Sequence, residues 1–202
     1  QGGEITVGIA QDLDKSLDPH LAVTAGTKEV LFNIFEGLVK PTPDDELVPA
    51  VAQSYQVSDD RKVYTFTLRD GVTFHSGEAV TADDVIYSIK RCAAAEGDKK
   101  PLVEAFSNIQ SVESPDPRTV VITLSQPDNE FLSYMTTAII PRSYANQDTA
   151  PVGTGPFKFV SRTAQDSVVL EKYDGYWGTP AYLDRVTFKI IENADALVLA
   201  LQ

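Results

Sequence analysis

Four oxygen-bearing side chains alternate along one short stretch near the beginning of the chain, and their spacing could suit a hard cation. They are Asp12, Asp14, Ser16 and Asp18. Oxygen ligands at every second position open a calcium-binding loop, but that loop also needs a glycine at its sharp turn and a bidentate glutamate at its end. The chain has Leu17 and Val23 at those places. A solvated acidic loop is therefore favoured, and we expect no metal ion here.

Nucleophilic chemistry would have to come from Cys92, the only cysteine, with His20 or His75 as the base. A reactive thiol needs surroundings that lower its pKa and a base within hydrogen-bonding distance. The sequence places Cys92 on an amphipathic helix beside a run of alanines, and neither histidine lies in a recognisable catalytic motif. These features favour a packed thiol without a catalytic role.

Paired carboxylates such as Glu36 and Asp83 could hydrolyse a secreted polymer if they faced each other across an open cleft. Helix capping offers a simpler explanation for Asp83. It follows Thr81, a good N-cap residue, so its charge would lie at the positive end of a helix dipole. The hydrolase stays open as an alternative from another class of protein.

Composition limits the remaining classes of function. The 202 residues are 43% hydrophobic and carry 29 acidic against 17 basic side chains, which gives a net charge of −12. A chain of this length can bury a substantial core, and its acidity disfavours binding to nucleic acid or to anionic membranes. The longest apolar run, Ala196 to Leu201, is far shorter than the roughly 20 residues that cross a bilayer.

The elements that must position these side chains follow from hydrophobic periodicity. The patterns predict strands over residues 4–9, 38–43, 54–57, 64–68, 108–112, 119–124, 157–160, 168–172 and 186–191, and helices over 27–35, 81–91 and 128–135. Pro115 and Pro117 lie between two of these strands and should end them. The last segment, 193–202, resembles a half-helix without a C-terminal cap, so we expect the chain to be a fragment of a longer protein.

The most specific pattern runs from Tyr64 to Arg91. It starts with an alternating strand, turns at Asp70-Gly71, resumes apolar alternation at Val72, and ends in a helix that Thr81 should cap. The order of these features resembles the family 5 extracellular solute-binding proteins, which are the peptide, oligosaccharide and nickel receptors of ABC importers. The residues that carry the resemblance are Leu68 to Val72, Phe74, Ser76-Gly77 and Val80 to Val85. Further matches are Leu17 to His20, Ile34 to Leu38, Pro49 to Ala52, Val152 to Phe157 and Tyr176 to Gly178.

The resemblance implies an α/β fold, namely a periplasmic-binding-protein-like type II lobe with mixed β-sheets and flanking helices whose second lobe is missing from this chain. By the family pattern, residues 1–38 and 142–202 form an incomplete first-lobe core, and residues 39–141 form the inserted subdomain of that lobe. It also implies a protein that is not an enzyme and that uses no cofactor.

The resemblance also points to two sets of ligand-binding residues. In the family, the loop after the Asp-Pro-His element faces the ligand cleft and often contacts ligand through its backbone. Here that loop consists of small residues that would let a ligand approach the main chain, although a solvent loop that merely enters a helix is the alternative. The loop residues are Val23, Thr24, Ala25 and Gly26, and a second set, from a later region near the cleft, is Tyr134, Thr136 and Thr137.

The function that the resemblance implies is that of a solute-binding receptor fragment of an ABC transporter. It would capture a peptide, or a related small solute such as an oligosaccharide or a nickel chelate, in an inter-lobe cleft for uptake. Its partners would be that ligand and the permease subunits in the membrane, with no nucleic acid, at a periplasmic or extracellular location with or without a lipid anchor. A third alternative is a protein–protein interaction module whose residues 196–201 dock on a partner or on a second copy of the chain.

Overall fold

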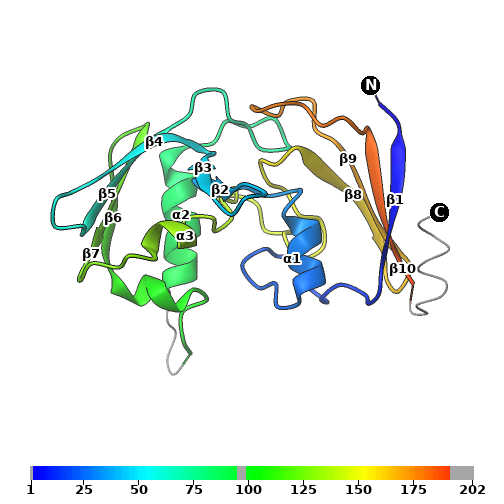
Figure 1. Ribbon diagram of the computed structural model, residues 1–202, viewed down its shortest axis with the longest axis horizontal. Coiled ribbons are helices and arrows are strands. Elements are labelled where there is room, and N and C mark those ends of the chain that lie inside the picture. The colour runs from blue at the N-terminus through cyan, green and yellow to red at the C-terminus, as the bar shows by residue number, and fades with distance from the viewer. Residues whose placement is uncertain (1, 95–98, 192–202) are drawn as a thin grey trace. The chain divides into compact units, whose positions relative to one another are not determined.

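The computed structural model describes residues 2–94 and 99–191. Within it the chain forms two compact units (Figure 1). Unit 1 contains Gln1–Phe35, His75–Gly77 and Ala145–Gln202, and unit 2 contains Glu36–Phe74 and Glu78–Tyr144. Each unit has a four-stranded sheet of its own.

The sheet of unit 1 joins the first strand of the chain to strands from its end. Its order is β1-β10-β9-β8. The strands are β1 (Glu4–Ile9), β8 (Phe157–Thr163), β9 (Ser167–Lys172) and β10 (Arg185–Ile190). β1 runs parallel to β10 with Glu4 opposite Arg185, whereas β10, β9 and β8 are antiparallel neighbours (Figure 1).

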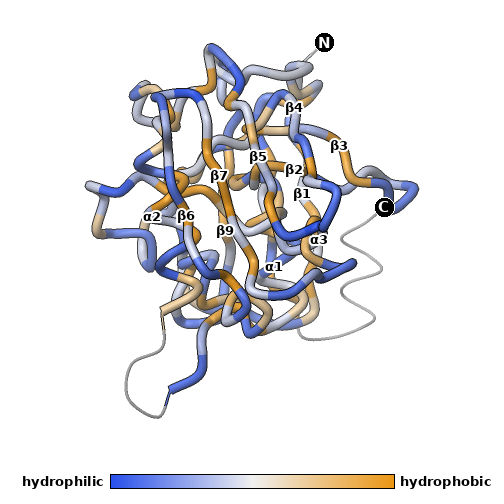
Figure 2. Tube along the Cα trace, turned by 90° about the vertical axis from the view of Figure 1, so that its left-hand side faces the viewer, coloured by the Kyte–Doolittle hydropathy of each residue, from blue (hydrophilic) through white to orange (hydrophobic). Residues whose placement is uncertain are grey.

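One face of this sheet is apolar because alternate residues of a strand point to the same side. Val168, Leu170, Val186 and Phe188 are buried on it. Figure 2 shows that the residues along β9 of unit 1 and β7 of unit 2 are largely hydrophobic. These strands are the apolar centres of the two sheets.

The glycines of the turn at 153–155 allow two stretches of backbone in unit 1 to touch. A Cβ on Gly153 would lie 2.4 Å from the carbonyl oxygen of Ile34, and one on Gly155 would lie 2.6 Å from that of Asn33. The Gly155 N–H donates to the Ile34 carbonyl at 2.8 Å. The turn packs against the residues that follow helix α1 (Ala25–Leu31) in the chain. This close backbone packing explains why the turn contains two glycines.

Unit 2 contains a four-stranded antiparallel sheet and a small ribbon. The sheet order is β4-β5-β7-β6. Its strands are β4 (Ala52–Val57), β5 (Val63–Leu68), β6 (Ile109–Asp116) and β7 (Thr119–Leu124), and the ribbon pairs β2 (Val39–Pro41) with β3 (Leu47–Pro49). The helical elements are α2 (Ala82–Ala93), the 3-10 helix η1 (Glu104–Asn108) and α3 (Phe131–Tyr134).

The core of unit 2 is aromatic and lies under α2 and α3. α2 packs against β6 and β7. The Tyr64 and Phe131 rings have centroids 4.7 Å apart, and Phe106 lies 6.2 Å from Phe131. Phe66 is fully buried on the same face of β5, as the alternating pattern of residues 64–68 predicts.

Helix α2 begins as the sequence predicts. The Thr81 hydroxyl accepts from the Asp84 N–H, and the Asp84 carboxylate accepts from the Thr81 N–H, which makes a complete capping box. Gly71 turns the chain with a φ of 79°, a conformation that glycine adopts at little cost. The pattern from Tyr64 to Arg91 is thus explained by the strand, the turn and the helix that it forms.

Several predicted boundaries differ from the structure. The predicted helix 128–135 is reduced to α3 (Phe131–Tyr134), the predicted strand 38–43 is reduced to β2 (Val39–Pro41), and β3 was not predicted. α1 covers Ala25–Leu31 instead of residues 27–35, and β8 continues to Thr163. The prediction that Pro115 ends its strand is wrong, because β6 runs on to Asp116 with a shifted register after Glu113. β6 is an edge strand, where a proline costs no ladder hydrogen bond. The half-helix predicted over 193–202 lies outside the described residues.

Candidate functional site

The first candidate segment, predicted as a loop from Val23 to Gly26, is exposed, but it is a loop only at Val23 and Thr24, because α1 begins at Ala25 and includes Gly26. The side chain of Val23 is 78% exposed, and Thr24, Ala25 and Gly26 are exposed as well. The Thr24 hydroxyl caps the helix by accepting from the Thr27 N–H at 3.4 Å. The surface of the loop therefore consists of small side chains and accessible main chain.

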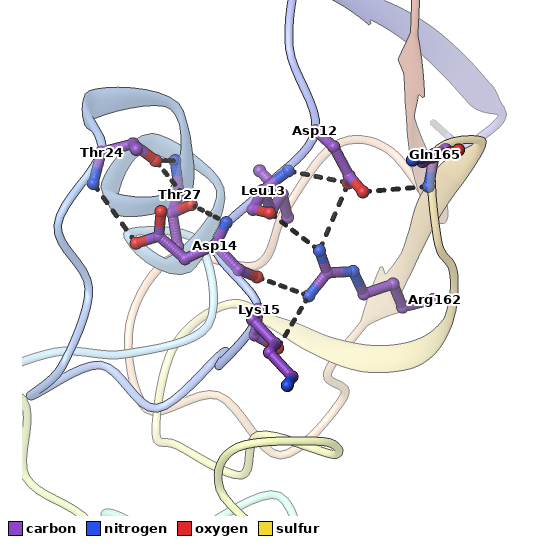
Figure 3. A network of polar contacts seen from close by, with 8 residues as sticks. All are labelled: Asp12, Leu13, Asp14, Lys15, Thr24, Thr27, Arg162 and Gln165. Carbon is purple, nitrogen blue, oxygen red and sulfur yellow. Dashed lines mark hydrogen bonds and ion pairs between the residues drawn. The ribbon is translucent and has the colours of Figure 1, made fainter.

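The carboxylate of Asp14 binds the main chain at the start of this segment (Figure 3). Asp14 Oδ2 accepts from the N–H groups of Val23 at 2.7 Å and Thr24 at 3.3 Å. The Asp14 N–H donates to the Thr27 hydroxyl at 2.8 Å, and the hydroxyls of Thr27 and Thr24 are 2.8 Å apart. Thr27 is fully buried, so the network closes on the inner side of the loop.

Arg162 on β8 holds the acidic stretch in turn (Figure 3). Its guanidinium donates to the carbonyl oxygens of Asp14 at 2.7 Å, Leu13 at 2.9 Å and Lys15 at 3.4 Å, and to the Asp12 carboxylate at 3.3 Å. The other Asp12 oxygen accepts from the Gln165 N–H at 2.9 Å. A planar guanidinium presents five N–H donors in a fixed fork, whereas the ammonium of lysine has three donors on a single nitrogen.

The environment lowers the pKa of both carboxyl groups below the ordinary aspartate value. For Asp14 the main cause is the hydrogen bond from the Val23 N–H, which stabilises the charged form. For Asp12, partial burial acts to raise the pKa, but hydrogen bonds from the Gln165 and Leu13 N–H groups and the charge of Arg162 together outweigh it. Both groups are ionised at neutral pH and bound to protein donors, so the expectation of a merely solvated loop is corrected. Within residues 2–94 and 99–191, no cluster of three or more potential metal-ligating side chains is present.

The second candidate segment lies in unit 2 and is tied down by its own hydroxyls. Tyr134 is 36% exposed, Thr136 is exposed and Thr137 is half-buried. The Thr136 hydroxyl donates to the Ser133 carbonyl at 2.9 Å, and the Thr137 hydroxyl donates to the Tyr134 carbonyl at 2.7 Å. Both hydroxyl protons are used in hydrogen bonds within the segment. Each hydroxyl oxygen could therefore accept a hydrogen bond from a ligand but not donate one.

The two candidate sets belong to different units. The loop set lies in unit 1, and Tyr134, Thr136 and Thr137 lie in unit 2. Sequence reasoning missed Asp14 and Arg162 as partners of the loop. The alternating aspartates were interpreted as a solvated acidic loop, and nothing in the sequence links a β-strand arginine to a stretch almost 150 residues earlier.

The structure does not assemble the catalytic alternatives. Cys92 is fully buried. Glu36 is buried with Lys40 at 3.3 Å, whereas Asp83 lies exposed on the first turn of α2 with Arg142 at 3.9 Å. Glu36 and Asp83 are thus each paired with a basic side chain rather than with each other.

His75 lies in a tight contact inside unit 1. Its Nε2 is 3.0 Å from the Gly155 carbonyl oxygen, and its Nδ1 accepts from the Gly153 N–H at 3.3 Å. Burial is the main reason why the pKa of His75 falls from 6.5 to about 4, so the ring is neutral and holds the 153–155 turn. This geometry favours a structural role over that of a general base.

Among the described residues, no helix is both long and apolar enough to cross a membrane. The fold defines the class of the protein, which is the type II periplasmic binding protein, as its likeness to solved structures shows. The structure of the ABC transporter-associated periplasmic binding protein DppA from Helicobacter pylori, solved in complex with the peptide STSA, is similar with a TM-score of 0.88 and 32% identity. That likeness covers 99% of this chain and 45% of DppA.

The chain belongs to the bacterial extracellular solute-binding proteins, family 5, whose middle region matches residues 46–202. It is 31% identical over 204 residues to the dipeptide-binding protein DppE of Bacillus subtilis, covering 88% of this chain and 37% of DppE. It is 33% identical over 189 residues to the glutathione-binding protein GsiB of Pectobacterium atrosepticum, covering 88% and 36%. The chain thus spans less than two fifths of the length of these two relatives, and its family consists of solute-binding proteins rather than enzymes.

Proposed function

We propose that this chain is part of a receptor that captures short peptides for an ABC importer. Membership of the solute-binding family supports the receptor role, and the hydrolase alternative is dropped because the family binds solutes. DppE and GsiB are named for a dipeptide and for glutathione, and DppA was solved with a peptide, which favours a peptide over an oligosaccharide or a nickel chelate.

We propose further that residues 1–38 and 142–202 are the core of one lobe and that residues 39–141 are its inserted subdomain. The division of the chain into two compact units with nearby boundaries supports this assignment. Ligand would enter a cleft between this lobe and a second lobe, and the closed form would be favoured by the contacts that it adds. The closed receptor would then deliver the ligand to the permease subunits, from a periplasmic or extracellular position, with lipid anchoring as a further part of the proposal.

One observation carries the binding proposal, namely that the exposed segment from Val23 to Gly26, which ends in the first turn of α1, is held in place by the hydrogen bonds that Asp14 accepts from Val23 and Thr24. A fixed surface of small residues lets a ligand reach main-chain groups. Tyr134, Thr136 and Thr137 are proposed as a second set of contacts, supported by the exposure of Tyr134 and Thr136. Self-association through residues 196–201 concerns residues outside the described part of the chain.

Calorimetry on the complete protein tests the proposal. The probes are the dipeptide Ala-Ala, glutathione, maltotriose and a nickel–histidine complex. Binding of a peptide probe with a dissociation constant in the micromolar range is expected, with no heat from the sugar or the chelate. Binding of maltotriose or nickel–histidine alone would replace the peptide assignment, and silence of all four probes would contradict it.

A further inference from the structure

The carboxylate of Asp14 is bound to the loop that we propose as a ligand contact. One oxygen of this carboxylate accepts from both Val23 and Thr24, at 2.7 and 3.3 Å. The backbone of Asp14 is bound as well, through the Thr27 hydroxyl at 2.8 Å. The loop is therefore fastened at its start by a side chain and at the first turn of α1 by a main-chain group.

Asp14 is in turn fixed to the sheet. Arg162 lies on β8, its side chain is only 15% exposed, and its shortest contact in this stretch is the Asp14 carbonyl oxygen at 2.7 Å. A second contact, to the Leu13 carbonyl oxygen at 2.9 Å, fixes the same stretch at a second point. The restraint thus passes from a strand, through Arg162 and Asp14, to the exposed loop (Figure 3).

We propose that Asp14 is a positioning residue for ligand binding, which presents the main chain from Val23 to Gly26 in a single conformation. The inference rests on the proposed function. A loop that is already ordered loses less conformational entropy when it binds a ligand, and that difference appears directly as affinity. The Oδ2 oxygen of Asp14 is engaged by the N–H groups of Val23 and Thr24, so the role assigned to Asp14 is exerted through these two residues.

Two substitutions in the complete protein test the role of this carboxylate with Ala-Ala and glutathione as probes. Asp14→Ala removes both acceptor bonds, and we expect it to weaken binding about tenfold to a hundredfold. Asp14→Asn keeps an oxygen that can accept from Val23 and Thr24, and we expect its affinity to stay within about threefold of the wild type. Asp60→Ala is the matched control, because Asp60 likewise accepts from a backbone N–H, that of Lys62 at 3.1 Å, but in unit 2.

Amide hydrogen exchange separates positioning from general support of the fold. The Val23 and Thr24 amides should exchange at least about tenfold faster in Asp14→Ala, with the amides of β8, β9 and β10 unchanged. Unchanged affinity of Asp14→Ala would overturn the proposal, and so would faster exchange throughout unit 1 or an equal loss of affinity in Asp14→Asn. If the wild-type protein binds neither probe, the proposed function fails, and the role of Asp14 in binding fails with it.

Discussion

Arg162 brings the acceptors of one loop around a single guanidinium. Three of them are backbone carbonyls, and the fourth is the Asp12 carboxylate. The buried Nε of Arg162 has no partner among the described residues, so the stabilisation comes from its two terminal nitrogens. Arg162 ties residues 12–15 to β8, whereas the carboxylate of Asp14 binds Val23 and Thr24.

We expect Arg162→Lys to lower the free energy of unfolding by about 2–3 kcal/mol, because one ammonium keeps the charge but cannot reach the same acceptors. Urea denaturation followed by circular dichroism measures the change. Arg185→Lys is the control, since Arg185 is 42% exposed and contacts Glu4 at 3.7 Å, and it should cost less than about 0.5 kcal/mol. Equal losses in the two variants would contradict the importance of the fork geometry.

His75 should make stability depend on pH. Its pKa is about 4 in the folded protein and 6.5 in an unfolded chain, so between these values the unfolded state binds more protons. The free energy of unfolding therefore falls as the pH drops from 6.5 to 4, by at most about 3 kcal/mol from this residue.

Urea titrations at pH 4.5, 5.5 and 7 compare the wild type with His75→Gln. Carboxyl groups contribute a slope of their own in both proteins, and the difference between the slopes isolates His75. Equal pH dependence of the free energy of unfolding in the wild type and His75→Gln would show that the His75 ring takes up no proton when the protein unfolds.

Residue identities could be predicted where the sequence pattern is local. The Thr81–Asp84 capping box spans three residues, and the structure confirms it. The partnership of Asp14 with the loop spans nine residues and that of Arg162 with Asp14 spans 148, so neither leaves a periodic signal in the sequence. Aspartates at alternate positions carry no mark that tells a metal ligand from an acceptor for backbone N–H groups.

At the scale of elements, the second candidate segment is shaped by a glycine. A Cβ on Gly37 would lie 2.4 Å from the carbonyl oxygen of Met135 and 2.6 Å from the carbonyl carbon of Thr136. The Val39 N–H donates to the same Met135 carbonyl at 3.3 Å, and the Ile139 N–H donates to the Glu36 carbonyl at 3.0 Å. Backbone atoms cannot move aside as a flexible side chain can, so the position requires glycine.

Gly37→Ala should therefore destabilise unit 2 by about 2–4 kcal/mol, as expected for a clash that neighbouring backbone cannot relieve. Thermal denaturation shows the effect as a lower midpoint. Gly26→Ala is the comparison, because nothing lies within 4 Å of its added Cβ and its place is helical, so its midpoint should stay the same or rise slightly. A harmless Gly37→Ala would mean that the 135–136 backbone is free to shift.

The elements themselves were predictable to the extent that one face of each is buried. The alternation of Tyr64, Phe66 and Leu68 predicts β5, and their burial follows from it. Pro115 shows the opposite case, since the sequence does not reveal that β6 is an edge strand that tolerates a proline. The end of α1 was misplaced because Ile34 and Phe35 are buried at helical spacing although the helix stops at Leu31.

At the scale of the whole molecule, the chain spans 37% of DppE and 36% of GsiB. If the proposed function holds, this stretch supplies one wall of a ligand cleft, and a single wall buries too little of a ligand for tight binding. We expect the 202-residue chain alone to bind Ala-Ala with a dissociation constant weaker than about 0.1 mM. Calorimetry against the complete protein tests this, and micromolar binding by the chain alone would contradict it.

The pairing of β1 with β10 has a consequence for biosynthesis. Glu4 and Arg185 are partners, so a ribosome that adds 5–20 residues per second releases β1 about 10 to 40 s before the strand that it joins. All strands of unit 2 lie between residues 36 and 144, and they emerge during this interval. During this delay β1 is apolar and unpaired, while the sheet of unit 2 can already have formed with open edges. Wrong pairing of β1 with one of those edges is therefore a misfolding hazard during translation.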